Sequence, residues 1–556
     1  MLIDARTIPT DEIIKTEVCI IGAGPAGITL ARELIGQNFR VCLLESGQTE
    51  PPDEDLQSLC KGEIIDELYQ DLSLSLCRQF GGAANFWHNS VRLLPLDKID
   101  FEKRDGLPYS GWPFSKSHLD PFYERAQHLC RLRPFAYDAE DWEDEQTPRL
   151  PFAGSRIATT TYQFSPRKIF THELRSEIRR SENITTYLNA NVVEIETDDT
   201  AKTVTRVRVA CFQGNGFWVK AKVFILATGG IENVRLLLLS NKTQNVGLGN
   251  QHDLVGRFFM EHPVVRLGMF IPSERQIFNS AGLYDIRWTN NIPVMGKLSL
   301  TEEVMRRQQL LNSYLLLVPK SIYESPAIKS LKVLLSSIRH AEVPKDLLQH
   351  LNNAIGGIDE IVTRIYRRAS NVKEFPYDIS HGGWSHCQGN EKRFRAFQVW
   401  SVTEQPPNPD IRVMLSDERD RLGLRKIQPL RWHWSDLEIH SLQQVQEILR
   451  EEIEHAGLGQ FQSLVALDRR KPKCVGGRHH MGTTRMHIDP KQGVVDENCR
   501  VHGVSNLFIT GSSVFPTGGA ANPTLTIIAL AIRLADRVKT VMASTVMASD
   551  AVAMYR

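Results

Sequence analysis

The sequence lacks a charge excess, paired cysteines and a metal-ligand motif. It has 66 basic and 65 acidic residues, so its net charge of +1 provides no field that would steer nucleic acid. The nine cysteines are odd in number, scattered, and include no Cys-x-x-Cys pair. This usage suits a reduced compartment and argues against a disulfide framework or a zinc site. We therefore predict no nucleic-acid partner and no metal.

Long apolar runs are also lacking. No run approaches the ~18 apolar residues of a membrane span, and charged residues interrupt the first twenty positions, where a secretory signal would need a continuous apolar core. We therefore expect a cytoplasmic protein with no transmembrane segment. At 556 residues the chain is too long for one ordinary core, which predicts two large domains or one domain interrupted by another.

The N-terminal stretch has the pattern of a dinucleotide-binding unit. A predicted strand at 16–21 runs into Gly22-x-Gly24-x-x-Gly27, and a helix and a second strand follow, ending at Glu45. Gly22 permits the tight turn, Gly24 lets the backbone approach a pyrophosphate, and Gly27 allows close packing of helix on strand. Glu45 is placed to accept hydrogen bonds from a ribose. The motif alone does not separate FAD from NAD.

A second glycine pair lies in the loop around Gly81, Gly82 and Asn85. Small residues here suggest a backbone lying close to something flat, although a plain glycine turn beside a core Trp87 explains the segment equally well. Further on, we expect an alternating strand at 184–195, a hairpin of 206–212 with 217–223, and a strand, glycine turn and helix around Gly229.

Glycine-rich motifs occur again in the C-terminal hundred residues. His479 and His480 lie in a segment that ends with Gly-Thr-Thr-Arg-Met, and a predicted strand at 506–510 leads into a loop starting at Gly511. Asn522 and Pro523 fit the N-cap and first position of an apolar helix over 523–538. The partial positive charge at that helix start would favour a nearby anion.

Between 266 and 468 the glycine signals fade, and we expect a substrate domain there. Helical apolar spacing with many basic residues marks 327–368, including Lys332, Arg339, Arg364, Arg367 and Arg368. Such a basic amphipathic surface can dock on a membrane or a partner. A helical cap with a solvated face is the more common origin of the pattern, and we prefer it here.

In order and spacing these motifs resemble the glucose-methanol-choline (GMC) oxidoreductases, which are FAD-dependent alcohol-oxidising enzymes. The matching pieces run from residue 16 to residue 538 and include the segment from Val255 to Pro263. The C-terminal Phe-Pro-Thr-Gly-Gly-Ala-Ala-Asn-Pro-Thr is similar to the pyranose oxidase and sugar dehydrogenase branch. The resemblance implies FAD as the cofactor. The residues implied to bind it are Gly22, Gly24, Gly27, Glu45, Gly81, Gly82, Asn85, Val193, Gly229, Gly511, Pro523 and Thr524.

The resemblance also assigns two catalytic residues. His479 takes the position of the family's base, and Asn522 takes the place of the partner at the start of the last helix. Alcohol oxidation needs an acceptor for the hydroxyl proton while carbon gives a hydride to flavin N5, and an imidazole suits that task. Asn522 cannot take a proton but can orient the alcohol. The alternative is that His480 is the base and His479 is structural, in which case Asn522 could be only an N-cap.

One departure from the family concerns attachment of the cofactor. Some sugar oxidases of the family link FAD through a His just before the Trp of the glycine-paired loop, whereas this chain has Phe86 before Trp87. We therefore expect non-covalent FAD, with a linkage through His88 as the minor alternative.

Together these expectations define an α/β protein with a discontinuous Rossmann-like FAD-binding domain (12–95, 183–265 and 472–541). A substrate domain of mixed sheet and helices (96–182 and 266–471) interrupts it, and 542–556 form a tail. The expected reaction is oxidation of a CH–OH group of a sugar, glycoside or aminoglycoside-like polyol, with oxygen or another electron acceptor. The alternatives are a lyase or decarboxylase on the same fold, and a flavin-containing binding or electron-transfer partner. A homo-oligomer is left open.

Overall fold

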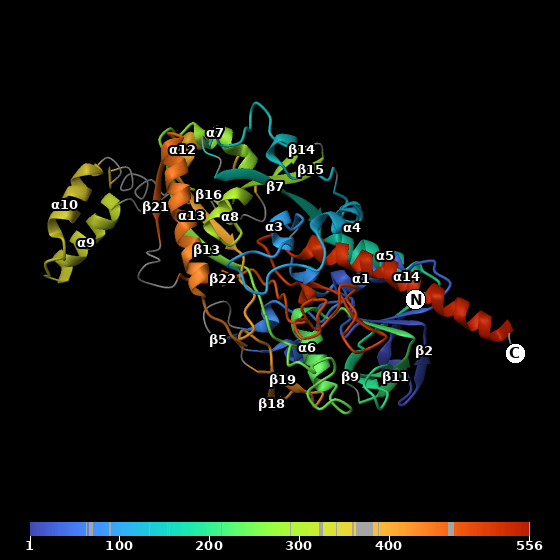
Figure 1. The fold of residues 1–556 in the computed structure, drawn as a ribbon. Coiled ribbons are helices and arrows are strands. Elements are labelled where there is room, and N and C mark those ends of the chain that lie inside the picture. Colours follow the sequence, from blue (N-terminus) through green and yellow to red (C-terminus); the bar gives the residue numbers. More distant parts are fainter. Residues whose placement is uncertain are drawn as a thin grey trace.

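The structure is a computed structural model, and its main body is built on a parallel sheet (Figure 1). The described residues are 1–62, 64–65, 71–87, 90–132, 134–152, 154, 156–212, 214–289, 291–321, 326–340, 342–358, 361–362, 382–386, 389–428, 430–464 and 472–554. The strands of the parallel sheet, in spatial order, are β1 (Leu2–Asp4), β8 (Ile184–Leu188), β4 (Val41–Leu44), β3 (Val18–Ile21), β12 (Val223–Leu226) and β23 (Leu507–Ile509). β3, β4 and β12 are buried throughout, as strands covered on both faces must be.

Helices and a small sheet cover this parallel sheet. Helix α1 (Pro25–Glu33) follows β3 directly and packs against α14 (Thr524–Met554) and α5 (Leu174–Arg180). Helix α6 (Gly229–Leu239) follows β12. The small sheet consists of β2 (Ile13–Lys15), β11 (Gly216–Lys220), β10 (Val204–Ala210) and β9 (Asn191–Thr197), and β10 and β11 form the expected hairpin.

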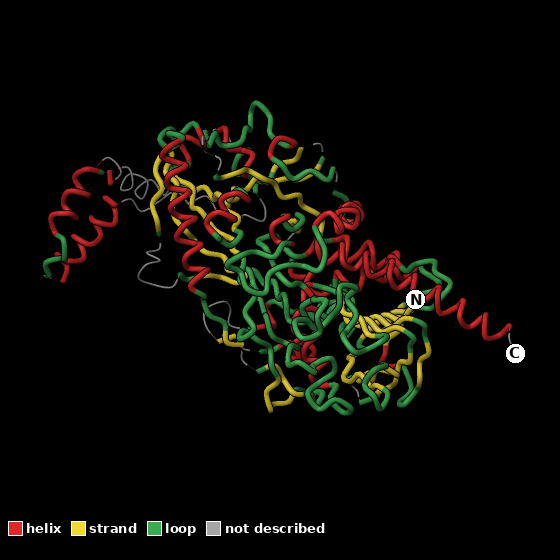
Figure 2. The backbone as a smooth tube through the Cα atoms, viewed as in Figure 1, coloured by secondary structure: helices red, strands yellow, loops and turns green. Residues whose placement is uncertain are grey.

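The second domain is organised around a nine-stranded sheet, seen as the upper group of strands in Figure 2. Its strands are β21 (Gly459–Ser463), β13 (Pro263–Pro272), β17 (Ala396–Thr403), β16 (Ser313–Lys320), β15 (Ile292–Leu300), β7 (Ile157–Pro166), β6 (Ser90–Leu93), β14 (Arg287–Thr289) and β22 (Cys474–Gly476). All its described strand pairs are antiparallel, where a mixed sheet was expected. The fold class, a parallel-sheet FAD domain with a second domain, is confirmed.

The remaining elements are short or lie at the edges. The helices are α2 (Glu54–Gln57), α3 (Lys98–Phe101), α4 (Lys116–Leu129), α7 (Ile277–Ser280), α8 (Glu302–Gln308), α9 (Pro326–His340), α10 (Leu347–Gly356), α12 (Asn390–Arg393) and α13 (Asp436–His455). The strands are β5 (Ile64–Ile65), β18 (Leu415–Arg419), β19 (Arg425–Ile427) and β20 (Leu430–Arg431). None of the described helices is long and apolar enough to cross a membrane.

Two expectations about single elements differ from the structure. The alternating stretch 184–195 is two strands, β8 and β9, which belong to different sheets. The chain breaks between them at Asn189, whose φ of 60° ends the strand geometry. Helix α14 runs on to Met554 through the segment expected to be a tail. The exact domain boundaries stay predictions.

A buried ion pair joins the segment after α3 to the end of β17. Arg104 Nη1 donates to Glu404 Oε2 at 2.9 Å, and both side chains are almost fully buried. Asp100, four residues before Arg104, contacts the loop that precedes α14. In this contact Thr517 Oγ1 donates to the Asp100 carbonyl oxygen at 2.5 Å. Pairing of this kind is required where a carboxylate is removed from water.

Replacing one member of this pair should destabilise the fold strongly. We expect Arg104→Met to lower the free energy of unfolding by about 3–5 kcal/mol, because Glu404 is then left buried without its cation. The matched control is Arg450→Met, which removes exposed pairs with Glu447 and Glu454 and should change the free energy of unfolding much less. Urea unfolding compares the two variants, and equal losses would contradict this account of the pair.

Candidate active site

A cavity of about 450 Å³ lies where the parallel strands end. Its walls come from the turn after β3, the end of β4, the turn after β12, and the loop after β23. The carboxyl ends of parallel strands meet at one edge of a sheet, where open α/β folds bind ligands. Residues from both ends of the chain therefore share one site.

The three glycines of the N-terminal motif have separate roles. Gly22 has a φ of 102°, which disfavours other residues, and a Cβ there would lie 2.7 Å from the Ala227 carbonyl oxygen. A Cβ on Gly27 would lie only 1.9 Å from the Gly22 carbonyl oxygen, so this glycine permits close packing and does not line the cavity. Gly24 is the N-cap of α1, lines the cavity, and would place a Cβ within 4 Å of no protein atom.

Glu45 is buried at the cavity wall and held by the backbone. Its Oε2 accepts from the Ala23 N–H and its Oε1 from the Gly47 N–H, both at 2.8 Å. Burial raises the pKa of this carboxyl, and the two backbone hydrogen bonds oppose that rise. The oriented carboxyl keeps lone pairs that can accept from a ribose hydroxyl.

The second glycine pair lies against the first motif. The Gly81 N–H donates to the Ala23 carbonyl at 2.8 Å, and a Cβ on Gly82 would lie 3.0 Å from Gly24 Cα. Asn85 Nδ2 donates to the carbonyls of Phe80 and Gly82, which holds the loop closed. Of the predicted residues in this loop, Gly82 lines the cavity, whereas Gly81 and Asn85 do not.

Of the remaining predicted cofactor residues, Gly229, Gly511, Pro523 and Thr524 line the cavity. Val193 does not, and its neighbour Val192 does. Successive side chains of a strand point to opposite faces, so a shift of one position along β9 exchanges the residue that faces the cavity. His88, the alternative attachment point, lies outside the described residues.

The shape and charge of the cavity fit FAD. Gly24, Gly229 and Gly511 all line it, and a Cβ on each would meet no protein atom within 4 Å. Any larger side chain at these positions would therefore take up space in the cavity. The N-termini of α1 and α14 both reach the cavity and supply N–H groups and positive potential for phosphate or an anionic ring. In the described part of the chain, no group of three metal-ligating side chains is found.

His479 lies in a chain of hydrogen-bonded side chains at the other end of the cavity. Its Nδ1 is 2.9 Å from Nδ1 of His262, whose Nε2 is 2.8 Å from the Gly519 carbonyl oxygen. Its Nε2 is 3.4 Å from Nδ2 of Asn522. Oε1 of the buried Glu261 accepts from the backbone N–H groups of both His479 and His262. The two predicted catalytic residues therefore lie together.

Burial keeps these imidazoles neutral. It lowers the pKa of His262 to about 4. The pKa of His479 falls well below its usual range, mainly through burial and then through the charges of His262, Arg92 and His480. A neutral imidazole near pH 7 has one ring nitrogen free to accept a proton.

His480 occupies a different position from its neighbour. Its ring packs on Phe259, and its Nε2 is 3.4 Å from Oγ of Ser75. Burial lowers its pKa to about 4. It lines the same cavity, but Asn522 lies beside His479.

Several residues of this site were not predicted as part of it. His262 and Glu261 contact His479 across more than 200 positions of sequence, a contact that no local pattern indicates. Arg92 and Arg478 also line the cavity. Arg78 lines it too, and its guanidinium pairs with Glu232 at 2.8 Å. The nearest sequence signal was the Val255 to Pro263 segment, which contains Glu261 and His262.

Comparisons with known families agree with this site. Residues 17–251 match the model of FAD dependent oxidoreductases, and residues 407–531 match that of the GMC oxidoreductases. The fold and site define an FAD-dependent oxidoreductase, and FAD is its cofactor. More specifically, its C-terminal residues 407–531 match the GMC oxidoreductases.

Individual relatives are more distant. The chain is 25% identical over 352 residues to the fructose dehydrogenase large subunit of Gluconobacter japonicus, a match that covers 63% of this chain and 53% of that subunit. It is 40% identical over 73 residues to the C-glycoside 3-oxidase of Arthrobacter globiformis, covering 13% of this chain and 14% of that enzyme. The structure of pyridoxine 4-oxidase from Mesorbium loti has a TM-score of 0.52 at 15% identity, covering 94% of this chain and 98% of that one. At that identity the last likeness shows the fold alone.

Proposed function

We propose that the protein oxidises a CH–OH group of a sugar, glycoside or aminoglycoside-like polyol to a carbonyl. The observation that carries this proposal is the 3.4 Å approach of His479 Nε2 to Asn522 Nδ2 at the cavity wall. A hydroxyl oxygen can lie within hydrogen-bonding distance of both atoms. The relatives named above act on fructose and on C-glycosides, which supports a sugar-like substrate.

The roles of the two side chains follow from their chemistry. When bound, FAD would supply the acceptor for a hydride from the alcohol carbon. His479 Nε2 takes the hydroxyl proton, and Asn522 donates a hydrogen bond to the same oxygen so that the C–H bond is oriented. Neither role needs a change of position, because both side chains already lie side by side.

His262 sets which nitrogen of His479 is free. A carbonyl oxygen can only accept, so Nε2 of His262 must carry the proton that is donated to Gly519. In neutral His262, Nδ1 is then an acceptor, and Nδ1 of His479 must donate to it. This leaves Nε2 of His479 unprotonated and facing Asn522, as a base requires.

Loss of this orienting contact should slow catalysis without emptying the cofactor site. We expect His262→Phe to lower the rate of flavin reduction about 10- to 100-fold, the cost of one orienting hydrogen bond of about 1.5–3 kcal/mol. His262→Gln is the matched control, because its amide offers both an acceptor and a donor and should recover part of the rate. Stopped-flow reduction at saturating substrate measures the effect; equal rates in the two variants would contradict it.

The cofactor is proposed to be held without a covalent bond, since Phe86 precedes Trp87. Acid precipitation should release all the flavin into the supernatant, and flavin that stays with the pellet would contradict this. A reoxidation assay with air or a dye determines whether the electron acceptor is oxygen or another oxidant. A lyase or an electron-transfer protein would leave the flavin oxidised when substrate is added without oxygen.

A further inference from the structure

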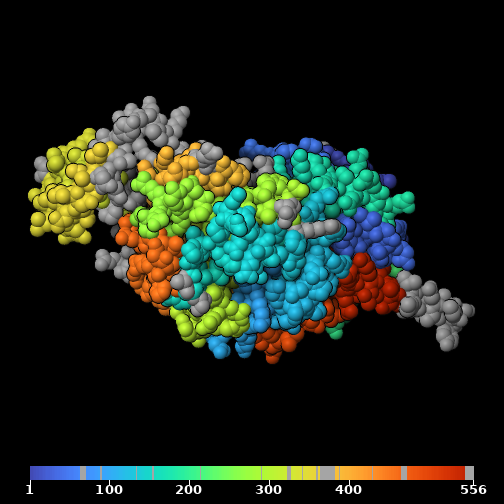
Figure 3. Space-filling view, turned by 90° about the horizontal axis from the view of Figure 1, so that it is seen from above, coloured from blue at the N-terminus to red at the C-terminus, as the bar shows by residue number. Residues whose placement is uncertain are grey.

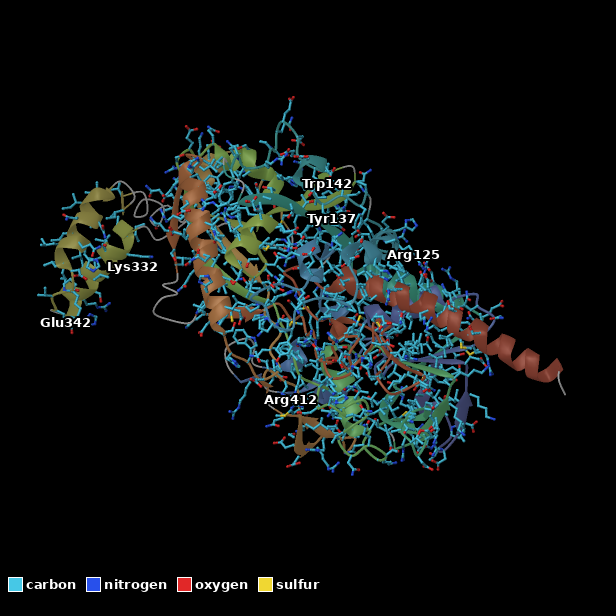
Figure 4. The ribbon with its side chains drawn as sticks, viewed as in Figure 1. Arg125, Tyr137, Trp142, Lys332, Glu342 and Arg412 are labelled. Atoms are coloured by element: carbon cyan, nitrogen blue, oxygen red, sulfur yellow. The ribbon has the colours of Figure 1, made fainter. Side chains whose placement is uncertain are left out.

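The helical hairpin of α9 and α10 stands apart from the body of the protein. Figure 1 shows the pair projecting at one side, and the view from above in Figure 3 shows the same separation. The two helices pack against each other. Figure 4 places Lys332 and Glu342 on this projection, outside the body of the protein.

The hairpin exposes many of its large apolar side chains and buries a polar contact between its helices. Between the helices, Ser330 is buried and lies 3.1 Å from Nδ1 of His350 and 3.2 Å from Nδ2 of Asn353. Large apolar side chains point outward instead. Ile338 is 77% exposed, Leu348 is 76% exposed and Ile355 is 70% exposed.

This exposed apolar surface is concentrated. Nearly half of the large apolar side chains that are exposed in the described part of the chain lie between 333 and 362. Monomeric proteins rarely leave large apolar areas in water, so we expect a partner surface to cover these side chains. The cap with a solvated face, which the sequence pattern favours, does not describe this arrangement.

The charge of the hairpin indicates a lipid surface. The described residues from 326 to 358 contain four basic and two acidic side chains, a net charge of +2, while the whole chain has only +1. Positive charge is thus concentrated where the apolar side chains point outward, which complements anionic lipid headgroups.

The length of the helices decides how they would meet that surface. Helix α9 has 15 residues, which is about 22 Å at 1.5 Å per residue. The apolar core of a bilayer is about 30 Å thick, so the helix cannot span it. We propose that the hairpin embeds in one leaflet of an anionic membrane and holds the enzyme at the membrane surface.

Vesicle flotation with the full-length, flavin-loaded protein tests this proposal. We expect the protein to float with vesicles of phosphatidylcholine and phosphatidylglycerol (about 7:3) and more weakly with phosphatidylcholine alone. The triple variant Ile338→Asp, Leu348→Asp, Ile355→Asp should lower the bound fraction at least about tenfold. The matched control carries Val246→Asp, Trp288→Asp and Ile488→Asp, which lie on the body with similar exposure, and should float like the wild type.

A second variant separates lipid charge from folding. Replacing Lys332, Arg339 and Lys345 with Gln should remove the preference for phosphatidylglycerol while flavin absorbance stays unchanged. If the Asp variant loses its flavin, the Gln variant carries the test. The proposal is overturned if the wild type floats with neither vesicle, or if both hairpin variants float as the wild type does. A second result would also overturn it: the wild type does not float and is a dimer in solution, and the triple Asp variant is a monomer.

Discussion

His479→Ala should slow the reduction of the flavin by substrate by about 10²- to 10⁴-fold, the range that a positioned general base contributes. The hydroxyl proton then has no acceptor at the place where Nε2 of His479 lies beside Asn522. FAD should remain bound, because the glycines that line the cavity and Glu45 are unchanged. Anaerobic stopped-flow absorbance measures the rate, and the flavin spectrum of the purified variant confirms that the cofactor is present.

His480→Gln is the informative control for this variant. His480 lines the same cavity, but its ring lies against Phe259 and Ser75. We expect a loss of less than about tenfold, since a residue that does not take the proton contributes only packing and hydrogen bonds. A larger loss in the His480 variant than in the His479 variant would reverse the assignment of the base. Asn522→Ala should fall between them, because it removes orientation and leaves the base.

Gly24→Val should yield a folded protein that binds its cofactor more weakly. Gly24 has a φ of −80°, which valine can adopt, and a Cβ there meets no protein atom within 4 Å. The added side chain would instead occupy cavity space at the start of α1, where the phosphates are expected. An overlap that costs about 1–3 kcal/mol weakens FAD binding about 10- to 100-fold. Titration of the apoprotein with FAD measures the affinity.

Gly356→Val provides the matched control for the cofactor variant. Gly356 also has open space around its Cβ and lies in α10, away from the cavity. Both variants should keep the circular dichroism of the wild type, and only Gly24→Val should bind FAD more weakly. Equal FAD affinity in the two variants would show that the backbone at Gly24 does not lie against the cofactor.

The parts of the site that depend on local chain geometry could be predicted from sequence. The turn from Gly22 to Gly27 and the acid at Glu45 follow from strand, helix and strand lying next to each other in sequence. The structure agrees because a φ of 102° at Gly22 and a 1.9 Å approach at Gly27 leave no room for other residues. Such constraints act within about 25 residues and are visible in any one sequence.

Other parts depend on contacts between distant segments. The pairing of His262 with His479 joins the residue before β13 to a loop 217 positions further along the chain, and only the fold brings them together. The break at Asn189 was missed because alternation continued on both sides of it while the chain changed sheets. In the hairpin, periodicity indicated amphipathic helices but not which face would point outward, since that depends on how α9 and α10 pair.

The central claim is that an alcohol gives its hydride to the flavin while His479 takes the proton. The most direct measurement mixes the protein anaerobically with sugars, glycosides, aminocyclitols and simple alcohols, and follows the flavin absorbance of the wild type and of His479→Ala. The account predicts that at least one sugar-like alcohol bleaches the wild-type flavin, and that the same substrate bleaches the variant at least about a hundredfold more slowly. A flavin that stays oxidised with every compound, or that bleaches equally fast in both proteins, would contradict it.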